Sequence, residues 1–507
     1  MRHSPHGASD SKTLGEFVAQ VGAVQRLNWA DMAVSSITDD SRQVRQGALF
    51  VAIAGQKADG HDFIPEALAR GAAALVCEKV PSPLPPCPVV QVRNSRLALS
   101  ALAAEFYEHP ARSLCMIGVT GTEGKGTTAE LIWALLCGAG YPTGSLGTVH
   151  YRLGSRVLEA SQTTPHPLSL HAMLREMVGA GLTHATMEVS SHALVQCRTA
   201  HVPFRVGVLT NVTQDHLDFH KTPQAYVRAK QMLFEQLPPD GIAVLNADSP
   251  VCERYSRAAR HASVLTYGVR NAADIRLEGH RCTVRGTRLL VRTPLQSYTI
   301  ESPLIGDYNC ENILAAIAVG FALSVQQDVV RRAMHRFEGV AGRLEKVEIL
   351  GRPDLPTVIA DYAHTPNALR RVLTTLRPLT RGWLICVFGC GGDRDRLKRP
   401  LMGQAATSLA DFTVITADNS RSERTEDIIA EIVGGIEPHS GLYKIEPDRR
   451  SAIQTAIEAA GPDDVVALCG RGCERFQILG ERRIPFDDRV VAREVLQHYT
   501  GAQRRTA

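Results

Sequence analysis

The sequence predicts a three-domain α/β protein, and three observations support that prediction. First, 507 residues exceed what a single hydrophobic core organises, so several domains are expected. Second, a buried-strand pattern at LCMIGV leads into the glycine-rich stretch VTGTEGKGTT, followed by an apolar helical stretch from Thr127 to about Cys137. Third, the C-terminal third alternates between apolar strand runs and amphipathic helical stretches, which is typical of a parallel sheet covered by helices.

The predicted domains are residues 1–110, 111–342 and 343–507, with boundaries near Pro110 and Gly342. The first block carries short apolar runs such as ALFVAIAG, separated by turns, and predicts a small α/β unit. The second block contains the glycine-rich stretch and the strand-like runs HATMEV, RVGVLTNV and GIAVLNAD. The third block contains the strand-like runs TVIADY, WLICVFG, FTVITAD and DVVALCG.

The composition excludes several classes of protein. The net charge of +4 is too small to indicate a nucleic-acid surface, and no apolar run approaches the length of a membrane span. We therefore expect neither nucleic-acid binding nor membrane insertion. The polar N-terminus, MRHSPHGASDSK, has no apolar core of a secretory signal and is expected to be a frayed tail. The twelve cysteines form no C-x-x-C pair, and most of them lie in apolar runs and are interpreted as buried thiols, which fits a cytoplasmic location.

The stretch VTGTEGKGTT resembles a phosphate-binding loop without the common spacing. Backbone N–H groups of a glycine turn at a helix N-terminus bind anions, so Lys125 would face the β- and γ-phosphates. The hydroxyls of Thr127 and Thr128 could reach a Mg²⁺ ion. Two residues are unusual: Gly126 stands where a metal-binding hydroxyl is expected, and Glu123 places a carboxylate near the phosphates. The alternative is an ordinary strand–helix turn, but the lysine and paired threonines favour a nucleotide.

Two polar motifs follow strand-like runs, at the sheet edge where α/β proteins bind ligands. EVSSHALVQCR offers a carboxylate, hydroxyls, a histidine and an arginine, although polar capping of a loop would explain it as well. TNVTQDHLDFH carries two aspartates and two histidines within six residues, which suits Mg²⁺ or Mn²⁺ better than a structural zinc. Lys230 then falls among apolar helical positions in AYVRAKQMLFEQL, and the pattern alone indicates a lysine that snorkels to solvent.

Downstream motifs are weaker when taken singly. Asn309 and Asn312 in GDYNCENILAA could cap a helix, whereas Arg343 in GRLEKV could reach a phosphate near the proposed domain junction. DYAHTP ends a strand with an aspartate and a histidine. FGCGGDRDRLKRP follows a strand and a glycine turn, so its basic residues indicate either an anionic ligand or a solvated face. ADNSR and CGRGCERFQ complete the polar loops of the third block.

In this order and at these separations, the motifs resemble the Mur ligases, and more narrowly the UDP-N-acetylmuramoyl-tripeptide synthetase (MurE) group. The resemblance covers nearly the whole chain. It implies an N-terminal UDP-binding α/β domain, a central P-loop ATPase-like α/β domain and a C-terminal Rossmann-like α/β domain. Its most specific stretches are QTTPHPLSL, EVSSHAL, TNVTQDHLDFH, DYAHTPNAL, FGCGGDRDRLKRPLMG and FDDR.

The resemblance also implies the chemistry. ATP would phosphorylate the terminal carboxylate of UDP-N-acetylmuramoyl-L-alanyl-D-glutamate to an acyl phosphate, and an incoming amine would then displace phosphate to form an amide. We expect a monomeric, cytoplasmic ligase of peptidoglycan precursor synthesis whose small-molecule substrates are ATP, the UDP-MurNAc-dipeptide and an amino acid. The expected cofactors are ATP and Mg²⁺ at two sites, one of them formed by a carbamylated Lys230.

Residue roles follow from the same resemblance. Catalytic roles fall on Lys125, His216, Lys230 and Arg343. Contacts to ATP fall on Gly121, Thr122, Gly124, Lys125, Gly126, Thr127, Thr128, Asn309, Arg343 and His364. The expected metal ligands are Thr127, Glu188, His216 and Lys230. Contacts to the UDP-MurNAc-peptide fall on Ser41, the turn at residues 56–60, Thr163, Thr164, Ser190, Gln196 and Arg198. The amino-acid pocket is expected to comprise Arg394, Asp418, Asn419, Arg421, Gly470 and Glu474.

The chain departs from the family pattern at three places. The acceptor signature Asp-Asn-Pro-Arg reads DNSR here, and Gly-Lys-Gly-His-Glu reads GRGCE. Because Arg421 and Glu474 remain, we expect meso-diaminopimelate rather than lysine as the amino acid. In the loop, Glu123 replaces an asparagine; Gly126 matches the related folylpolyglutamate synthases, in which the next residue, here Thr127, serves the metal. These departures leave two alternatives: a paralogue that ligates a different amino acid in specialised metabolism, or a non-catalytic nucleotide-binding homologue.

Overall fold

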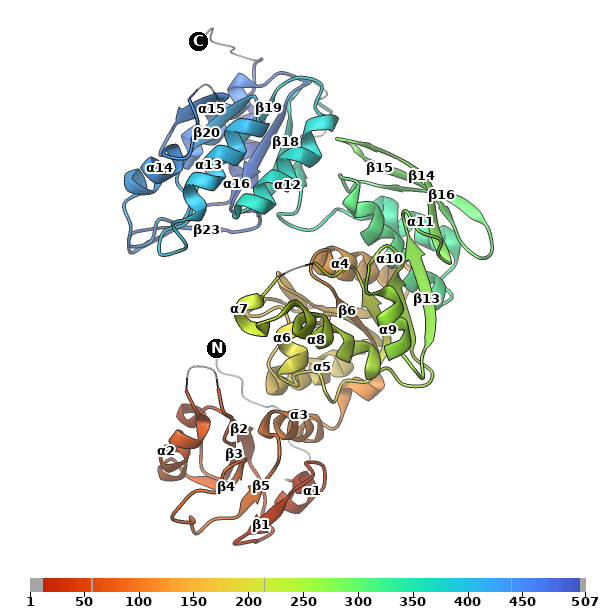
Figure 1. The fold of residues 1–507 in the computed structure, drawn as a ribbon, viewed down its shortest axis with the longest axis vertical. Helices are drawn as coiled ribbons and strands as arrows, with labels where there is room; N and C mark the ends of the chain where they lie inside the picture. The colour runs from red at the N-terminus through yellow and green to blue at the C-terminus, as the bar shows by residue number, and fades with distance from the viewer. Residues whose placement is uncertain are drawn as a thin grey trace. The chain divides into compact units, whose positions relative to one another are not determined.

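The computed structural model describes residues 12–55, 58–213, 215–349, 351–352, 354–438 and 440–501. The chain divides into two compact units. The first comprises Met1–Arg276, Arg292–Gln296 and Glu311–Ala333, and the second comprises Leu277–Val291, Ser297–Cys310 and Met334–Ala507. Figure 1 shows the helices and strands of both units as a ribbon.

The first unit begins with a five-stranded sheet of order β1-β5-β4-β3-β2, in which only β1 runs antiparallel to its neighbour. Leu49 and Val51 of β3 pack on one face of this sheet, and Ala48 and Phe50 pack on the other. Both faces are therefore buried, which explains the continuous apolar run in this strand. The strands are β1 (Gln25–Leu27), β2 (Ser36–Thr38), β3 (Ala48–Val51), β4 (Ala72–Cys77) and β5 (Val89–Gln91), and the helices are α1 (Leu14–Val18), α2 (Ile64–Ala69) and α3 (Ser95–Phe106).

A larger sheet forms the centre of the first unit. Its order there is β13-β12-β11-β6-β10-β7-β8-β9, parallel from β13 to β7 and antiparallel in the last two pairs. β6, which leads into the glycine loop, thus lies between β11 and β10 and is buried on both faces. The strands are β6 (Cys115–Thr120), β7 (Thr143–Leu146), β8 (His150–Arg152), β9 (Val157–Glu159), β10 (His184–Glu188), β11 (Phe204–Leu209), β12 (Ile242–Asn246) and β13 (Ser263–Gly268).

The helices around this sheet begin in different ways. Thr222 caps α8 by accepting a hydrogen bond from the backbone N–H of Ala225 at 3.1 Å, and Pro223 occupies the first helical position. By contrast, no side chain in the described part of the chain caps α4 after Gly124. The helices are α4 (Lys125–Gly138), α5 (Pro167–Gly179), α6 (Ser191–Val195), α7 (Leu217–His220), α8 (Pro223–Glu235), α9 (Cys252–Ala258), α10 (Tyr308–Ala322) and α11 (Gln327–Arg336).

The second unit contains a six-stranded sheet of order β17-β18-β22-β19-β20-β21, parallel except for β17. The strands β14 (Ile275–Thr283), β15 (Gly286–Arg292) and β16 (Ser297–Ser302) are neighbours in order, and β23 (Phe476–Leu479) pairs with β24 (Arg482–Pro485). The strands of the six-stranded sheet are β17 (Glu345–Val347), β18 (Thr357–Asp361), β19 (Leu384–Phe388), β20 (Phe412–Ile415), β21 (Leu442–Ile445) and β22 (Val465–Cys469).

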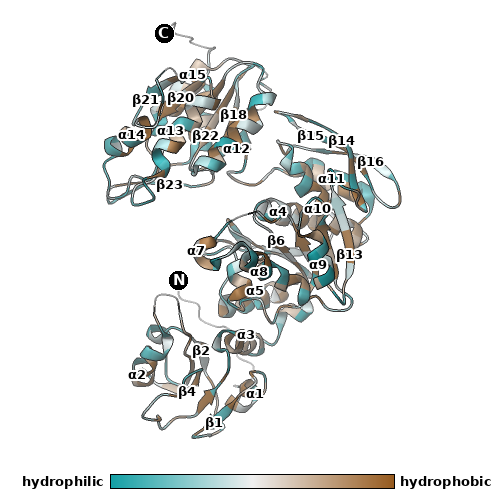
Figure 2. Ribbon diagram, viewed as in Figure 1, coloured by the Kyte–Doolittle hydropathy of each residue, from teal (hydrophilic) through white to brown (hydrophobic). Residues whose placement is uncertain are grey.

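Helices cover both faces of this C-terminal sheet. The helices α12 (Pro366–Leu376), α13 (Lys398–Leu409) and α14 (Thr425–Val433) share one core with Cys386 and Phe388 of β19. On the other face, α15 (Arg449–Ala459) and α16 (Asp488–Gln497) pack on Ile385 and Val387. Figure 2 shows hydrophobic and hydrophilic residues together on these helices, as expected of helices with one buried face. In the part of the chain that the structure describes, no helix has the length and apolar character of a membrane span.

Two ion pairs between α15 and α16 differ sharply in burial. Arg449 and Asp488 are both fully buried and joined by two hydrogen bonds, Nε to Oδ1 at 2.8 Å and Nη2 to Oδ2 at 2.6 Å. Arg450 and Glu494 join the same helices at 2.8 Å, but both side chains are about half exposed. Removing one partner of a buried pair leaves an uncompensated charge in a medium that cannot solvate it, whereas water solvates the remaining charge of an exposed pair.

We expect Asp488→Ala to lower the free energy of unfolding of the second unit by about 3–5 kcal/mol. Glu494→Ala should lower it by less than about 1 kcal/mol, because this pair is exposed. Urea titration followed by circular dichroism measures both. Equal losses in the two variants would contradict the assigned role of burial.

Candidate functional site

The glycine loop between β6 and α4 has a backbone that requires its glycines. Gly124 has a φ of +77° and Gly121 a φ of +152°. A Cβ atom at Gly124 would collide with Oδ1 of Asn312, and one at Gly121 would collide with Oγ1 of Thr210. The loop ends at the N-terminus of α4, where the described residues provide no side-chain cap. Unpaired N–H groups and the helix dipole at such an end favour an anion.

The loop is held to the segment that follows β11. The backbone N–H of Thr122 donates to the carbonyl of Asn211 at 2.8 Å, and the N–H of Glu123 donates to Oδ1 of Asn211 at 3.0 Å. Thr210 Oγ1 donates to the carbonyl of Glu123 at 2.6 Å. Position 123 therefore contributes its backbone to the loop, while the side chain of Glu123 is exposed. Water and salt screen an exposed carboxylate, so the cost that its charge would impose on a bound phosphate is small.

Two lysines converge on one carbonyl oxygen of this loop. Lys125 Nζ donates to the carbonyl of Gly121 at 3.0 Å, and Lys230 Nζ donates to the same oxygen at 2.5 Å. Lys230 is 1% exposed and lies over the ring of Tyr226, so the interpretation as a snorkelling lysine is wrong. Burial, and then the charge of Lys125, lower the pKa of Lys230 well below its usual value. Two amines beside one carbonyl make a site that favours negative charge.

Glu188 lies at the end of β10 and explains the glycine after the loop lysine. It is 5% exposed, and its Oε1 accepts a hydrogen bond from the backbone N–H of Thr148 at 2.7 Å. A Cβ atom at Gly126 would lie 3.3 Å from Oε1 of Glu188, and one at Gly147 would lie 2.8 Å from it. Glycine at position 126 therefore leaves room for this carboxylate next to the first turn of α4, where a side chain would crowd it.

His216 lies in the loop before α7, where it has a φ of +51°. Its Nε2 lies 3.4 Å from a carboxylate oxygen of Asp215, and its ring meets that of His192 edge to face at 4.9 Å. Thr127 is half-buried in the first turn of α4. Among the described residues, no three His, Cys, Asp or Glu side chains are grouped so as to hold a metal ion. The predicted metal ligands Thr127, Glu188, His216 and Lys230 therefore stay a prediction.

Most of the residues predicted to hold the UDP-MurNAc-peptide lie together. Thr164 Oγ1 donates to the carbonyl of Glu188 at 2.7 Å and accepts from the N–H of Ser190 at 3.0 Å. Arg198 donates to the carbonyl of Thr164 at 2.8 Å and to Oε1 of Gln196 at 2.7 Å. Thr163 joins the group through Thr148, at 3.2 Å between the hydroxyls. These contacts fix a strip of polar groups along the ends of β7 and β10.

Ser41 lies in the N-terminal part of the first unit. Its hydroxyl donates to Glu66 Oε2 at 2.7 Å, and this hydrogen bond is the main cause of the lowered pKa of Glu66. Two residues before Ser41, Asp39 forms an ion pair with His166 at 3.0 Å, and His166 is the N-cap of α5. The loop that carries Ser41 is thereby tied to the segment after Thr164. The beginning of the predicted turn at residues 56–60 lies outside the described residues.

In the second unit, the predicted amino-acid residues meet at the carboxyl ends of β20 and β22. Asn419 Nδ2 donates to Oε2 of Glu474 at 2.8 Å. Gly470 has a φ of +109°, and a Cβ atom there would lie 2.9 Å from Oδ2 of Asp418. Burial, and then the charge of Asp418, raise the pKa of Glu474. A position that brings two carboxylates this close favours a cationic ligand.

Two predicted arginines flank these carboxylates. Arg421 Nη1 donates to the carbonyl of Gly392 at 2.7 Å, which ties the loop after β20 to the loop after β19. The rest of its guanidinium makes no hydrogen bond within the described chain, and the residue is half-buried. Arg394 is exposed in the loop after β19. A half-occupied arginine fork can bind a carboxylate with its remaining N–H groups.

The remaining predicted ATP contacts in the second unit share no hydrogen bond with one another in the described chain. Arg343 is exposed, with its guanidinium 5.8 Å from the centre of the Tyr362 ring. His364 is also exposed, and its Nδ1 lies 2.8 Å from the carbonyl of Tyr362. Asn309 lies in the first turn of α10 and donates through Nδ2 to the carbonyl of Ile305 at 2.8 Å, whereas a capping side chain would accept from a backbone N–H. Their contribution to ATP binding stays a prediction.

Comparison with known proteins identifies the family. The Mur ligase family catalytic domain matches residues 33–107, the Mur ligase middle domain residues 119–320, and the Mur ligase glutamate ligase domain residues 342–472. A UDP-N-acetylmuramoyl-L-alanyl-D-glutamate–2,6-diaminopimelate ligase from Solibacter usitatus is 44% identical over 493 residues, covering 96% of this chain and 98% of that protein. The chain belongs to the Mur ligase family. The predicted family and the predicted three-domain α/β fold are therefore confirmed.

Further relatives agree with this assignment. The protein of the same name from Gloeobacter violaceus is 44% identical to this Mur ligase, covering 95% of this chain and 98% of the relative. A solved 2,6-diaminopimelate ligase of this kind is 31% identical, with a TM-score of 0.69 over 92% of this chain and 96% of that one. The MurF ligase from Thermotoga maritima, solved in complex with ADP, is 21% identical with a TM-score of 0.57, covering 91% and 96%; it shares the fold.

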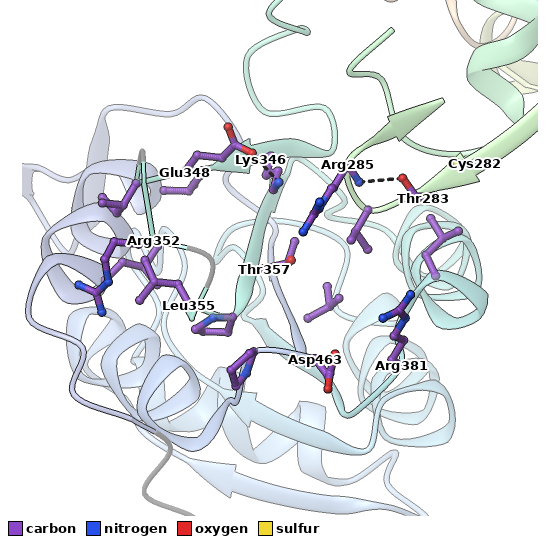
Figure 3. A pocket seen from close by; sticks show the side chains of 18 of the residues that line it. Cys282, Thr283, Arg285, Lys346, Glu348, Arg352, Leu355, Thr357, Arg381 and Asp463 are labelled. Atoms are coloured by element: carbon purple, nitrogen blue, oxygen red, sulfur yellow. Dashed lines mark hydrogen bonds and ion pairs between the residues drawn. The ribbon is translucent and has the colours of Figure 1, made fainter. Parts of the chain in front are cut away.

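The second unit of this Mur ligase also contains a cavity of about 810 Å³ away from the predicted residues (Figure 3). Thr357 and Val465 line it, and these residues begin β18 and β22. The cavity thus lies at the amino ends of the strands, opposite the loops that carry Asp418 and Glu474. None of the predicted site residues lines it. Because ligands of parallel sheets bind at the carboxyl edge, we assign the site to the loops rather than to this cavity.

Several residues of the site were missed from the sequence. Thr148 orients Glu188, Asn211 holds the glycine loop, and Tyr226 lies beneath Lys230 while its hydroxyl is 3.1 Å from that of Thr122. Asn312, interpreted as a possible cap, accepts a hydrogen bond from Thr128 at 3.2 Å and occupies the space beside Gly124. These residues act through contacts between distant segments, so no local pattern marks them.

We expect Gly124→Ala to distort the glycine loop, because the substitution adds both a strained φ and a collision with Asn312. Gly140→Ala is the matched control: its φ is +85°, but a Cβ atom there meets nothing within 4 Å. Both variants should lose about 1 kcal/mol or more of stability through backbone strain. Only Gly124→Ala should also weaken ADP binding, by at least about 10-fold, as measured by isothermal titration calorimetry. Equal ADP affinity in the two variants would contradict this account of the loop.

Proposed function

We propose that this Mur ligase is an ATP-dependent amide ligase that adds meso-diaminopimelate to UDP-N-acetylmuramoyl-L-alanyl-D-glutamate through an acyl phosphate. The observation that carries the proposal is the pair of amines from Lys125 and Lys230 on the carbonyl of Gly121, beside the uncapped N-terminus of α4. This arrangement supports binding of the phosphates of ATP. Relatives that match this chain along nearly its full length are named for the same acceptor and the same amino acid, which supports this assignment.

The two lysines would have different roles at the phosphates of ATP. Lys125 hydrogen-bonds the loop carbonyls of Gly121 and Thr122 and can transfer to phosphate oxygens when they arrive. As charge moves to the leaving phosphate, this cation stabilises it without reorganising solvent, because the site is already oriented. Lys230 is too buried to exchange partners with water, and its burial and the charge of Lys125 favour the neutral amine, which is the form that can react with carbon dioxide.

The oxygen donors beside the loop are of the kind that Mg²⁺ binds, which supports our proposal of two Mg²⁺ ions. Glu188 directs a buried carboxylate at the space left by Gly126, and Mg²⁺ prefers oxygen ligands. A carbamate on Lys230 would convert a buried amine into an anionic oxygen ligand and give Lys125 a counter-charge. We propose Thr127, Glu188, His216 and carbamylated Lys230 as the residues that hold the ions. When bound, the metal would neutralise the phosphate and carboxylate oxygens that must approach one another.

In the second unit, the proposed amino-acid site combines both signs of charge. Asp418 and Glu474 offer carboxylates for an ammonium group, and the guanidinium of Arg421 offers donors for a carboxylate. An amino acid with a second zwitterionic end, such as meso-diaminopimelate, satisfies both. The amine left outside such a grip is the nucleophile that the reaction needs. Lysine lacks the second carboxylate, so it would leave Arg421 without an ionic partner.

We expect the purified protein to add meso-diaminopimelate when incubated with ATP, Mg²⁺, the UDP-MurNAc-dipeptide and a panel of amino acids, with products read by mass spectrometry. Lys125→Met should reduce turnover at least about 100-fold, as losses of transition-state donors do. Lys444→Met is the control, because Lys444 is exposed on β21. Preferred addition of another amino acid would identify a paralogue of different specificity. No mass gain with any amino acid would refute the proposed function.

We expect Lys230 to carry a carbamate in buffer that contains bicarbonate. With ¹³C-bicarbonate, a carbamate carbonyl signal should appear in the NMR spectrum of the wild type and of Lys444→Met but be absent from Lys230→Met. Activity of the wild type should rise with bicarbonate, because the new oxygen ligand replaces a buried amine. A signal of equal intensity in Lys230→Met would place the carbamate on another amine and contradict this assignment.

A further inference from the structure

Arg471 lies behind the proposed amino-acid site and is fully buried. It follows Gly470 in the loop after β22, where the family pattern has a lysine. Its Nη1 donates to Oδ1 of Asn419 at 3.1 Å, and its Nη2 donates to the carbonyl of Phe476 at 2.6 Å. The same Nη1 lies 3.6 Å from Oε2 of Glu474 and 4.0 Å from Oδ1 of Asp418. The guanidinium of Arg471 is therefore hydrogen-bonded to one predicted pocket residue, Asn419, and lies near two others, Glu474 and Asp418.

The contacts of Asn419 leave its amide a single orientation. Oδ1 accepts from Nη1 of Arg471 and from the backbone N–H of Ile478 at 2.8 Å. Nδ2 donates to Oε2 of Glu474 at 2.8 Å. If the amide were flipped, its NH₂ group would face two donors and its oxygen would face a carboxylate, so the observed orientation is the only one that satisfies all partners. Arg471 and the backbone N–H of Ile478 thereby orient Asn419 together, and Asn419 in turn holds the carboxylate of Glu474.

Arg471 is itself held from the side away from the pocket. Its guanidinium lies 5.6 Å from the centre of the Phe486 ring. Its Nε is 3.8 Å from Oδ1 of Asp488, the carboxylate that also binds Arg449. The planar fork of arginine reaches Asn419, Phe476 and this second pair at once. A side chain without hydrogen-bond donors could make none of these contacts.

The positive charge of Arg471 also matters to the two pocket carboxylates. Asp418 and Glu474 both lie near Nη1 of the guanidinium, and burial and the charge of Asp418 raise the pKa of Glu474. The charge of Arg471 acts in the opposite direction and favours ionised Glu474. A pocket that is to bind an ammonium group needs both carboxylates ionised and oriented before the substrate arrives.

We propose that Arg471 is a positioning residue that determines recognition of the ammonium end of the amino-acid substrate, by holding Asn419 and Glu474 in their binding orientation. The inference rests on the proposed function of the surrounding site. Arg471 does not contact the substrate itself. It acts through Asn419, and replacing it should weaken amino-acid binding without touching the nucleotide site.

The test compares Arg471→Met with Arg475→Met in the full-length enzyme. Arg475 belongs to the same turn but is exposed, so it is the matched control. We expect Arg471→Met to raise the KM for meso-diaminopimelate at least about 10-fold and to leave the KM for ATP and for the UDP-MurNAc-dipeptide unchanged. Arg475→Met should change none of them. A parallel rise of all three KM values, or none, would overturn the inference.

A double-mutant cycle separates positioning from a general loss of structure. If Arg471 acts through Asn419, Arg471→Met in an Asn419→Ala background should raise the KM for the amino acid no further than Asn419→Ala alone. Additive effects would overturn the inference. If the wild type ligates no amino acid, the proposed function fails, and a crystal structure of Arg471→Met still decides the positioning role. A rotated Asn419 amide supports it, and an unchanged Asn419–Glu474 hydrogen bond refutes it.

Discussion

The burial of the Lys230 amine is the constraint on which the central site of the first unit depends, because burial and the neighbouring charge of Lys125 both disfavour the protonated form of this amine. Lys125 and Lys230 share the carbonyl oxygen of Gly121, and the buried member of the pair cannot turn to solvent. The rest of the central site can be understood as support for this pair. Asn211 and Thr210 hold the loop, and Tyr226 lies beneath the buried amine. A bound phosphate would pair with the charge of Lys125, and a carbamate on Lys230 would turn the buried amine into an anionic partner for it.

The second unit also depends on buried ionisable groups, and here the groups at the site are carboxylates. Asp418 and Glu474 approach each other at the carboxyl edge of the parallel sheet, and Arg471 lies behind them. Here the excess charge is negative, so the pocket favours an ammonium group. Behind Arg471, the fully buried pair of Arg449 and Asp488 joins α15 to α16 and anchors the floor of the pocket. The site thus depends on buried charges that are fully paired only when the ligand completes the set.

The comparison of prediction with structure separates local from non-local information. The strand, glycine loop and helix around β6 could be predicted because their apolar periodicity and glycines are local in the chain. Lys230 could not be interpreted correctly from its pattern, since its burial depends on packing against Gly121, more than a hundred positions earlier. The oddity of Gly126 has the same origin: the glycine makes room for Glu188 of a neighbouring strand. Three predicted ATP contacts stay predictions, because no contact within the described chain brings together Asn309, Arg343 and His364.

The sequence by itself determined the family and the architecture, because both follow from ordered motifs and from apolar patterns that any homologous chain repeats. It also identified most of the polar residues at the strand ends, since parallel strands bring their carboxyl ends to one edge. Only the tertiary structure decided how those residues act. It placed the side chain of Glu123 in solvent while its backbone holds the loop, and it buried Arg471 behind Asn419. Exposure and hydrogen-bond orientation are properties of the folded environment, and residue type alone does not set them.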